Sequence, residues 1–543
     1  MLSAAVFAVS GCGGFLDTCY NINQTDEINA QNAGSIWSFA YAFYAPLGHG
    51  LQSIDYNVFA TVSDECQQTS PSSEALYFNR GVINESVNPL FTRYQDCYEG
   101  IRAANFFLDY VADGKGEALL ALNRDIVTDE YNYKRDVQSL NWFIAEAHIA
   151  KAYYYSELIR MFGGVPIVEN FDPSTEELVS RSSYDACVEY IVEEIDNWKN
   201  SLALNWDEYV DREGRFTYGV ALAIKARTLL YAASPLNNPD NDRTRWEEAL
   251  KAAGDVINSG MYSLAPDYDM FSGEDPLSSP EAIYIVRTYV SSDPEKANYP
   301  ISTPGGQSGA CPTQNIVDAY EYVDTPDEKN PYLNRDPRFY ASIVYNGAEW
   351  NGRIIAEGPS ETDDMANTNA SRTGYYLRKF LTDELNLEQN QTAQHNWIAY
   401  RYAEVLLNYA EAANELYGPD VVPTGQQLSA RQALQMVRGR ASTSLPQVTA
   451  SSTDEFREVL KHERQVELAF EDHRYWDLLR WKDAEDVLNR PVQGVRISKV
   501  NGVYSYAVVD VAERKFNEAN YRLPFLRSEI ENSKGTLVQN PGY

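Results

Sequence analysis

The chain is poor in the residue types that build metal and redox centres. Its 543 residues include six cysteines and five histidines. No two cysteines are spaced as Cys-x-x-Cys, the pairing that structural zinc sites and dithiol redox centres usually use. His462-Glu463 begins like a zinc-protease motif, but Val466 stands where the second histidine is required. The sequence therefore predicts no cofactor.

Positive charge is also scarce, because 45 Lys and Arg residues face 78 Asp and Glu residues and leave a formal net charge of -33. A chain this acidic repels the phosphate backbone of nucleic acids. Long apolar runs are absent too, since no stretch after the N-terminus has the length of a transmembrane helix. We therefore expect neither a nucleic-acid partner nor a membrane-spanning segment.

The N-terminus carries a signal of its own. Residues 1–11, MLSAAVFAVSG, are small and apolar but too few to cross a bilayer. They lead into Cys12 through Val9-Ser10-Gly11, which looks like the lipobox of bacterial lipoproteins, where the cysteine is acylated and becomes the first mature residue. We interpret residues 1–11 as the remnant of a signal peptide, although the usual basic start is missing. Acyl chains on Cys12 would anchor the protein to a membrane without spanning it.

The remaining cysteines are an odd number and are widely scattered, which favours buried thiols over a disulfide framework. They are Cys19, Cys66, Cys97, Cys187 and Cys311.

Helical periodicity dominates much of the chain. Apolar residues recur at steps of three and four in four segments, which are residues 140–168, 217–234, 397–418 and 459–481. Small residues alternate with large aromatics in them, and residues 246–260 form another such piece that ends at Gly260. This pattern is typical of helix pairs that interlock. It predicts a mostly α fold of tetratricopeptide-like helix pairs stacked into a partial superhelix.

The region of about 286–395 differs in character. It is rich in Pro, Gly, Asn, Asp and Tyr, with short β-like runs such as Ile343-Val344-Tyr345 and turn signals at Asn346-Gly347 and Asn351-Gly352. We expect an irregular, loop-rich half with small β elements. Loops on a rigid scaffold are where binding usually occurs.

A series of motifs resembles one known family through nearly the whole chain. They include CGGFLDT from Cys12, AEAHIAKAYYYSELIRMFGGVPIV from Ala145, NRDPRFYASIVYNG from Asn334, RYAEVLLNYAEAANEL from Arg401 and ERQVELAFEDHRYWDLLRW from Glu463. In this order they resemble the SusD/RagB-like outer-membrane lipoproteins of Bacteroidota.

The resemblance implies both a fold and a function. Residues 12–543 would form a single SusD-like unit, with four tetratricopeptide-like pairs and the loop-rich insertion at about 286–395. The pairs would be the scaffold of an irregular ligand-binding half. The protein would be a lipid-anchored lipoprotein of the outer membrane, exposed on the cell surface. It would bind an oligosaccharide or polysaccharide and partner a SusC-like TonB-dependent transporter.

Glycan binding needs flat aromatic faces for the sugar rings and polar groups for the hydroxyls. The resemblance points to Tyr94, where family members place an exposed aromatic, and to Asp64, which matches an acidic loop residue that contacts sugar hydroxyls. Tyr77, Tyr299 and Trp350 are loop aromatics whose position suits binding and local packing equally well.

Two alternative functions and one possible structural ion remain beside glycan binding. Glu467 and Glu471 are one helical turn apart and suggest the carboxyl pair of a glycoside hydrolase. Arg464 and Arg474 are nearby, however, so we predict ion pairs and no enzyme. Helix-pair repeats also bind peptides, which leaves a receptor for peptides or other nutrients as the second alternative. Acidic doublets such as Asp267-Tyr268-Asp269 have a spacing that suits a structural calcium ion. None of them continues into a complete calcium-binding loop.

Overall fold

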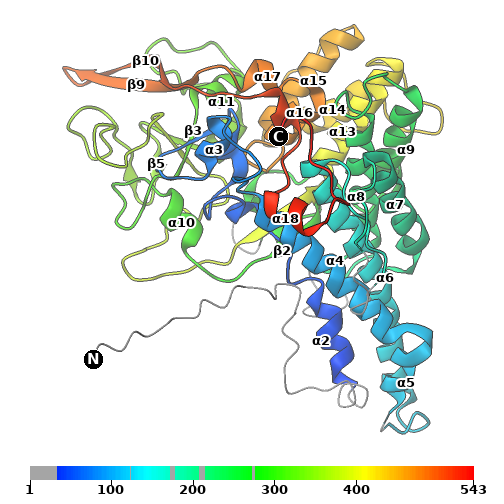
Figure 1. The fold of residues 1–543 in the computed structure, drawn as a ribbon. Helices are drawn as coiled ribbons and strands as arrows, with labels where there is room; N and C mark the ends of the chain where they lie inside the picture. Colours follow the sequence, from blue (N-terminus) through cyan, green and yellow to red (C-terminus); the bar gives the residue numbers. More distant parts are fainter. Residues whose placement is uncertain (1–32, 123, 171–177, 207–213, 272–274) are drawn as a thin grey trace, which may run out of the picture.

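The computed structural model describes residues 33–122, 124–170, 178–206, 214–271 and 275–543, whose arrangement Figure 1 shows. The predictions for Cys12 and Cys19 lie outside these residues. Cys66, Cys97, Cys187 and Cys311 are buried free thiols, as predicted.

The helices on one side of the molecule form the predicted superhelical scaffold (Figure 1). Helix α6 packs on α7, α8 on α9, α9 on α13, and α13 on both α14 and α15. Their bounds are α6 (Glu130–Phe162), α7 (Tyr184–Trp198), α8 (Tyr218–Ala233), α9 (Arg243–Ser259), α13 (Tyr402–Tyr417), α14 (Ala430–Arg438) and α15 (Thr453–Glu467).

Local sequence signals fix the ends of these helices. The side chains of Ser183, Thr217 and Asp242 accept hydrogen bonds from backbone N–H groups in the first turns of α7, α8 and α9. Helix α6 stops at Gly163 and α9 at Gly260, which have φ angles of 75° and 65°. Glycine adopts this region without strain, so both ends fall where the sequence predicts them.

Three further helices, α2 (Gly34–Ala42), α4 (Phe91–Val111) and α5 (Lys115–Ala121), extend the scaffold at its N-terminal end. Helix α4 approaches α6 closely at Gly100, where a Cβ atom would lie 2.1 Å from the ring of Tyr154. The hydroxyl of Tyr154 donates to the carbonyl of Phe43 at 2.7 Å, which ties α2 to α6. Among the described residues, no helix is long and apolar enough to span a bilayer.

The other half contains short elements joined by loops, as expected from its composition. Its strands pair antiparallel two by two: β1 (Cys66–Gln68) with β3 (Ala310–Pro312), β2 (Ala282–Arg287) with β8 (Asn396–Arg401), β4 (Ile343–Tyr345) with β7 (Tyr375–Leu377), β5 (Glu349–Trp350) with β6 (Arg353–Ile354), and β9 (Val492–Val500) with β10 (Val503–Ala512). The hairpin of β9 and β10 projects from the molecule in Figure 1.

Short helices connect these strands and complete the chain. They are α3 (Ala75–Asn79), α10 (Asp293–Asn298), α11 (Gln314–Ala319), α12 (Pro337–Ser342), α16 (Arg474–Trp481), α17 (Ala484–Val487) and α18 (Arg527–Asn532), with 3-10 turns at Gly50–Gln52, Phe59–Val62, Ala112–Gly114, Lys199–Ser201, Asp269–Phe271, Asp275–Ser278 and Glu518–Tyr521.

The prediction of one continuous helix over residues 459–481 is wrong. Helix α15 ends at Glu467 and α16 begins at Arg474. Between them, Phe470 and Asp472 have φ angles of 68° and 64°, which no α-helix permits. Phe470 and Tyr475 are both buried, so the apolar periodicity continues across a link that is not helical.

A buried ionic network surrounds the end of α15. The Glu467 carboxylate accepts hydrogen bonds from Arg338 at 2.9 Å, Arg401 at 2.7 Å and Arg440 at 2.9 Å. All four side chains are at most 3% exposed. Burial by itself raises the pKa of Glu467, but Arg440, Arg401 and Arg338 outweigh it and hold that pKa far below its usual value.

Neighbouring carboxylates extend the network. Glu281 pairs with both Arg401 and Arg440, Glu463 with Arg338, and Glu471 with Arg401. The predicted ion pairing of these glutamates is therefore confirmed, but its partners differ from those expected. The arginines come from α12, β8 and the segment after α14, because Arg464 and Arg474 pair with aspartates instead.

We expect Glu467→Gln to destabilise the fold by about 3–5 kcal/mol, because three buried guanidinium groups would lose their shared counter-ion. Urea denaturation measures the change. Asp255→Asn, which breaks the exposed pair of Lys251 and Asp255, is the control and should shift stability by no more than about 0.5 kcal/mol. If Glu467→Gln shifted the free energy of unfolding as little as Asp255→Asn does, the network would add nothing to stability.

Candidate functional site

An open groove crosses the loop-rich half. It consists of two adjoining hollows, of about 600 and 280 Å³, which share Tyr340, Arg378 and Asp383. This size suits a small ligand or a few sugar rings. The lining residues are Tyr268, Asp269, Phe271, Tyr340, Ala341, Ser342, Tyr345, Ala348, Glu349, Trp350, Asn351, Gly352, Arg378, Lys379, Phe380, Leu381, Thr382, Asp383 and Glu384.

Secondary structure fixes the aromatic wall of the groove. Tyr340 belongs to α12 and Tyr345 to β4, and both rings are half-buried. The ring of Tyr345 lies 4.7 Å from that of Tyr332 and 5.1 Å from that of Phe339, between ring centroids. The Tyr340 hydroxyl donates to the carbonyl of Tyr332 at 2.6 Å. The two rings are thus held in place while part of each faces the groove.

An ion pair lies between the two hollows. Arg378 follows β7, and its guanidinium binds the Asp383 carboxylate at 2.7 Å and lies 5.6 Å from the Trp350 ring. Glu349 and Glu384 are exposed at the rim. The groove therefore offers aromatic faces, hydroxyls, two paired cations and several carboxylates, which together can stack on an apolar ring face and hydrogen-bond to hydroxyl groups.

Two groove residues are anchored in the buried network. The Tyr268 hydroxyl donates to Glu467 at 2.7 Å, and the Lys379 ammonium binds Glu471 at 2.7 Å. Lys379 is 4% exposed, so its charge is directed into the protein. The floor of the groove is consequently continuous with the scaffold.

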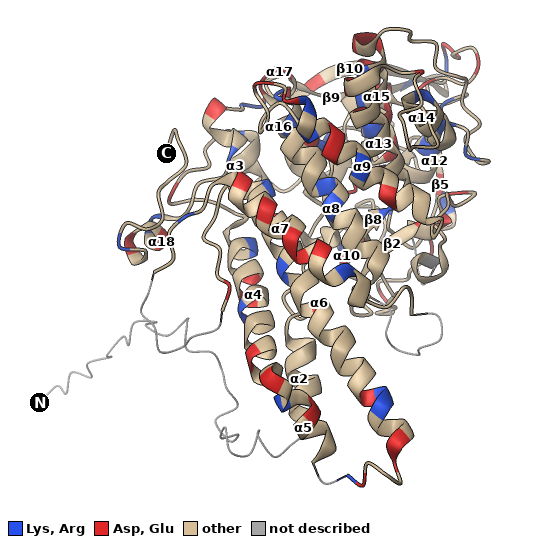
Figure 2. Ribbon diagram, turned by 90° about the vertical axis from the view of Figure 1, so that its right-hand side faces the viewer, with Lys and Arg blue, Asp and Glu red and all other residues tan. Residues whose placement is uncertain are grey.

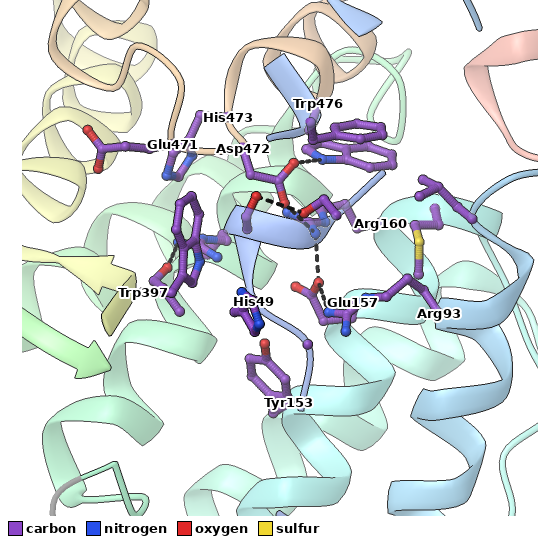
Figure 3. A pocket seen from close by; sticks show the side chains of 18 residues that line it. His49, Arg93, Tyr153, Glu157, Arg160, Trp397, Glu471, Asp472, His473 and Trp476 are labelled. Atoms are coloured by element: carbon purple, nitrogen blue, oxygen red, sulfur yellow. Dashed lines mark hydrogen bonds and ion pairs between the residues drawn. The ribbon is translucent and has the colours of Figure 1, made fainter. Parts of the chain in front are cut away.

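A second, smaller cavity is lined in part by charged side chains (Figure 3). Arg160 pairs with Glu157 at 2.6 Å and with Asp472 at 3.5 Å, and the Trp476 indole donates to Asp472 at 3.1 Å. Burial, helped by nearby Arg93 and His395, lowers the pKa of His49 to about 4. The cavity measures about 50 Å³, which suits ordered water and not a sugar ring.

Comparison with known proteins identifies the chain. Residues 286–543 match the model described as "SusD family", and residues 15–230 match the model described as "Starch-binding associating with outer membrane". The chain belongs to the SusD family.

Relatives and solved structures agree with this membership. SusD-like protein P38 of Formosa agariphila is 24% identical over 66% of this chain and 70% of its own length, and SusD-like protein P2 of the same organism is 25% identical over 78% and 77%. A SusD-like protein from Bacteroides fragilis superposes with a TM-score of 0.77 at 25% identity, covering 96% of this chain and 99% of its own. A SusD-like carbohydrate binding protein from that organism gives 0.74 at 23% identity, covering 94% and 99%.

The prediction that this SusD-family chain exposes Tyr94 is wrong. The side chain is 7% exposed. Its ring stacks on Phe91 at 5.1 Å and meets the edges of Phe162 and Phe525 at 5.3 and 5.8 Å. Helix α4 is covered on this face by α6 and by the C-terminal segment, which the local sequence around Tyr94 does not reveal.

The three predicted loop aromatics, Tyr77, Tyr299 and Trp350, differ in burial and in position. Tyr299 and Trp350 are 0% and 1% exposed and pack edge to face at 5.6 Å in a small second core. Trp350 still borders the groove and is the one predicted residue that does. Tyr77, in α3, is 41% exposed and lies outside the groove. The sequence analysis did not name Tyr340, which lines the groove. Tyr340 lies in the family motif that begins at Asn334, where it could have been found.

Asp64 lies away from the groove, and its carboxylate is hydrogen-bonded within the protein. Arg474 binds both of its carboxylate oxygens, at 2.8 and 2.9 Å. Burial raises the pKa of Asp64, but Arg474 more than offsets this and lowers it. As a sugar contact Asp64 therefore stays a prediction, and its observed role is to tie α16 to the segment before β1.

Metal binding finds little support in the described residues. Within them, no three His, Cys, Asp or Glu side chains gather as a metal site requires. Asp242, from a second acidic doublet, Asp240-Asn241-Asp242, caps α9 by accepting from the Thr244 N–H.

The buried carboxyl of Glu65 generates a pH prediction. Burial and the adjacent Asp64 raise its pKa to about 8 from an ordinary 4.5. The folded state thus keeps a proton that the unfolded state releases, so stability from Glu65 is complete below pH 4.5 and is lost as the pH rises toward 8. Between pH 5 and pH 8, Glu65 should lower the free energy of unfolding of the wild type by on the order of 3 kcal/mol. Glu65→Gln should abolish this fall. Urea denaturation at both values tests it, and parallel pH profiles for wild type and variant would contradict the assignment.

Proposed function

We propose that the groove binds a glycan and that the protein is a non-catalytic receptor for glycan import. The observation that carries the proposal is the pairing of two fixed aromatic rings, Tyr340 and Tyr345, with the polar groups of Arg378 and Asp383 in one open groove. Sugar rings have apolar C–H faces and a rim of hydroxyls, and this arrangement complements both. Among the structural neighbours, one carries the name of a carbohydrate binding protein, which supports the same ligand class.

We further propose that the protein works at the cell surface. The lipobox at Cys12 supports acylation of the mature unit, residues 12–543, and the description of the matching N-terminal family model supports association with the outer membrane. A receptor anchored there can pass captured oligosaccharide or polysaccharide to a SusC-like TonB-dependent transporter. Resemblance to the family supports this delivery step.

The arrangement of carboxylates supports binding without catalysis. A glycoside hydrolase needs a general acid whose environment favours the protonated form, together with a second carboxylate across the sugar. Glu467 and Glu471 are both engaged by buried arginines. In the groove, Asp383 is paired with Arg378, while Glu349 and Glu384 are exposed to solvent at the rim.

We expect Tyr345→Ala and Arg378→Ala each to weaken glycan binding about tenfold or more, because each removes a contact surface from the groove. Isothermal titration against a panel of neutral oligosaccharides measures the affinity, and circular dichroism confirms folding. Tyr289→Ala, which removes a side chain 94% exposed outside the groove, is the matched control. Equal weakening by Tyr289→Ala would place the site elsewhere, and binding of peptides alone would favour the nutrient-receptor alternative.

The charge of the groove predicts a preference among glycans. Its cations, Arg378 and Lys379, are both paired, whereas Glu349 and Glu384 add negative charge at the rim. Neutral glycans should therefore bind more tightly than uronate or sulfated glycans of equal length, and added salt should narrow the difference. The double substitution Glu349→Gln with Glu384→Gln should also narrow it. Tighter binding of the anionic glycan to wild type would reject this preference.

A further inference from the structure

Four large apolar side chains are exposed together where α5 turns into α6. Leu122 is 43% exposed, Ile126 45%, Val127 82% and Tyr131 80%. We call these four residues the apolar tip. Exposed apolar side chains gathered in one patch commonly mark a contact with a protein or a membrane, and in this structure nothing covers them.

The N-terminal segment joins the fold at the same end of the molecule. Helix α2 begins at Gly34, and the next residue, Ser35, lies in hydrogen-bond contact with Tyr110 in the last turn of α4. The ring of Phe39 lies 4.8 Å from that of Tyr110. Just beyond that turn, the chain enters α5 and the apolar tip. Figures 1 and 2 both place the start of α2 at the end where α5 turns into α6.

A lipid on Cys12 would hold this end near the bilayer. Only residues 13–32 separate Cys12 from the first described residue. Twenty residues span at most about 70 Å when fully extended, and about 25 Å with random-coil dimensions. The apolar tip would then be among the parts of the protein nearest to the lipid surface, whereas β5 at the groove lies at the opposite end (Figure 1).

The charged side chains around the apolar tip are mostly paired. Residues 122–136 contain three basic and four acidic side chains. Most of these charges are paired with one another, as Arg124 is with Asp136 at 2.8 Å and Lys134 with Glu130 at 2.6 Å. These charges are therefore largely balanced by their neighbours, and the apolar side chains of the tip lie beside ion pairs, with few isolated charges.

We propose that the apolar tip inserts into the interfacial layer of the membrane that holds the lipid anchor. The inference rests on the acylation of Cys12 in the proposed function. Val127 and Ile126 enter the apolar boundary, and Tyr131 lies at headgroup level with its hydroxyl in water, as interfacial tyrosines do. One lipid anchor leaves a protein free to rotate on its tether. A second contact at the tip limits this rotation and fixes the orientation of the protein on the membrane.

Site-specific fluorescence tests this contact. On a Cys19→Ser background, Val127→Cys is labelled with the polarity-sensitive dye NBD, because the described cysteines are buried. The matched control is Val508→Cys in β10, 54% exposed and on the hairpin at the other end. Each acylated protein is reconstituted in phosphatidylcholine vesicles. We expect a blue-shifted emission, quenched by spin-labelled lipid, at residue 127 and a water-like emission at residue 508.

Three outcomes would overturn the proposal. They are water-like emission at both positions, equal shifts at both, and a shift at residue 127 that needs a co-reconstituted transporter, which would make the tip a protein contact. Mass spectrometry of the vesicle-bound protein checks acylation, and a Cys12 without lipid would remove the tether and the proposal with it. Glycan titration of the soluble Cys12→Ser variant separates these failures from failure of the groove.

Discussion

Several segments of the loop-rich half are joined to the scaffold by one buried carboxylate, that of Glu467. It lies at the last turn of a scaffold helix and binds Arg338 from α12, Arg401 from the end of β8 and Arg440 from the segment after α14. A buried ion network often adds little net stability over apolar packing, because desolvation offsets the Coulomb attraction. Its value here is geometric. Guanidinium groups accept few arrangements around a carboxylate, so the loops have one position on the scaffold instead of several.

The groove inherits its rigidity from this arrangement. Arg338 is two residues from Tyr340 in a single short helix, and Tyr268 donates directly to Glu467. A binding surface already in place loses less conformational entropy when a ligand arrives than one that must be ordered. Oligosaccharides are flexible and bind weakly. A groove that is ordered in advance therefore helps to hold them, because little further conformational entropy is lost on binding. The irregular half therefore behaves as a fixed surface in spite of its few and short strands.

The sequence predicted what local patterns determine and missed what distant segments determine. The ends of α6 and α9 follow from Gly163 and Gly260, and the β4 run follows from its own residues. The break after Glu467 arises because that carboxylate and the adjacent link meet arginines far away in the chain, which periodicity cannot show. The burial of Tyr94 and the meeting of Tyr345 with Arg378 likewise come from tertiary packing, so four of the five predicted site residues lie outside the groove.

The placement of charge separates the roles of the protein's carboxylates. In the network, Glu281, Glu463, Glu467 and Glu471 are matched by arginines and one lysine, so they contribute little to the net charge of -33. The excess negative charge must lie mostly on the surface, where it keeps copies of the protein apart and repels polyanions. A neutral, hydroxyl-rich ligand interacts only weakly with the electrostatic field of this surface. In the proposed glycan receptor, ring faces and hydrogen bonds would supply recognition, and the acidic surface would repel polyanions without adding to the affinity.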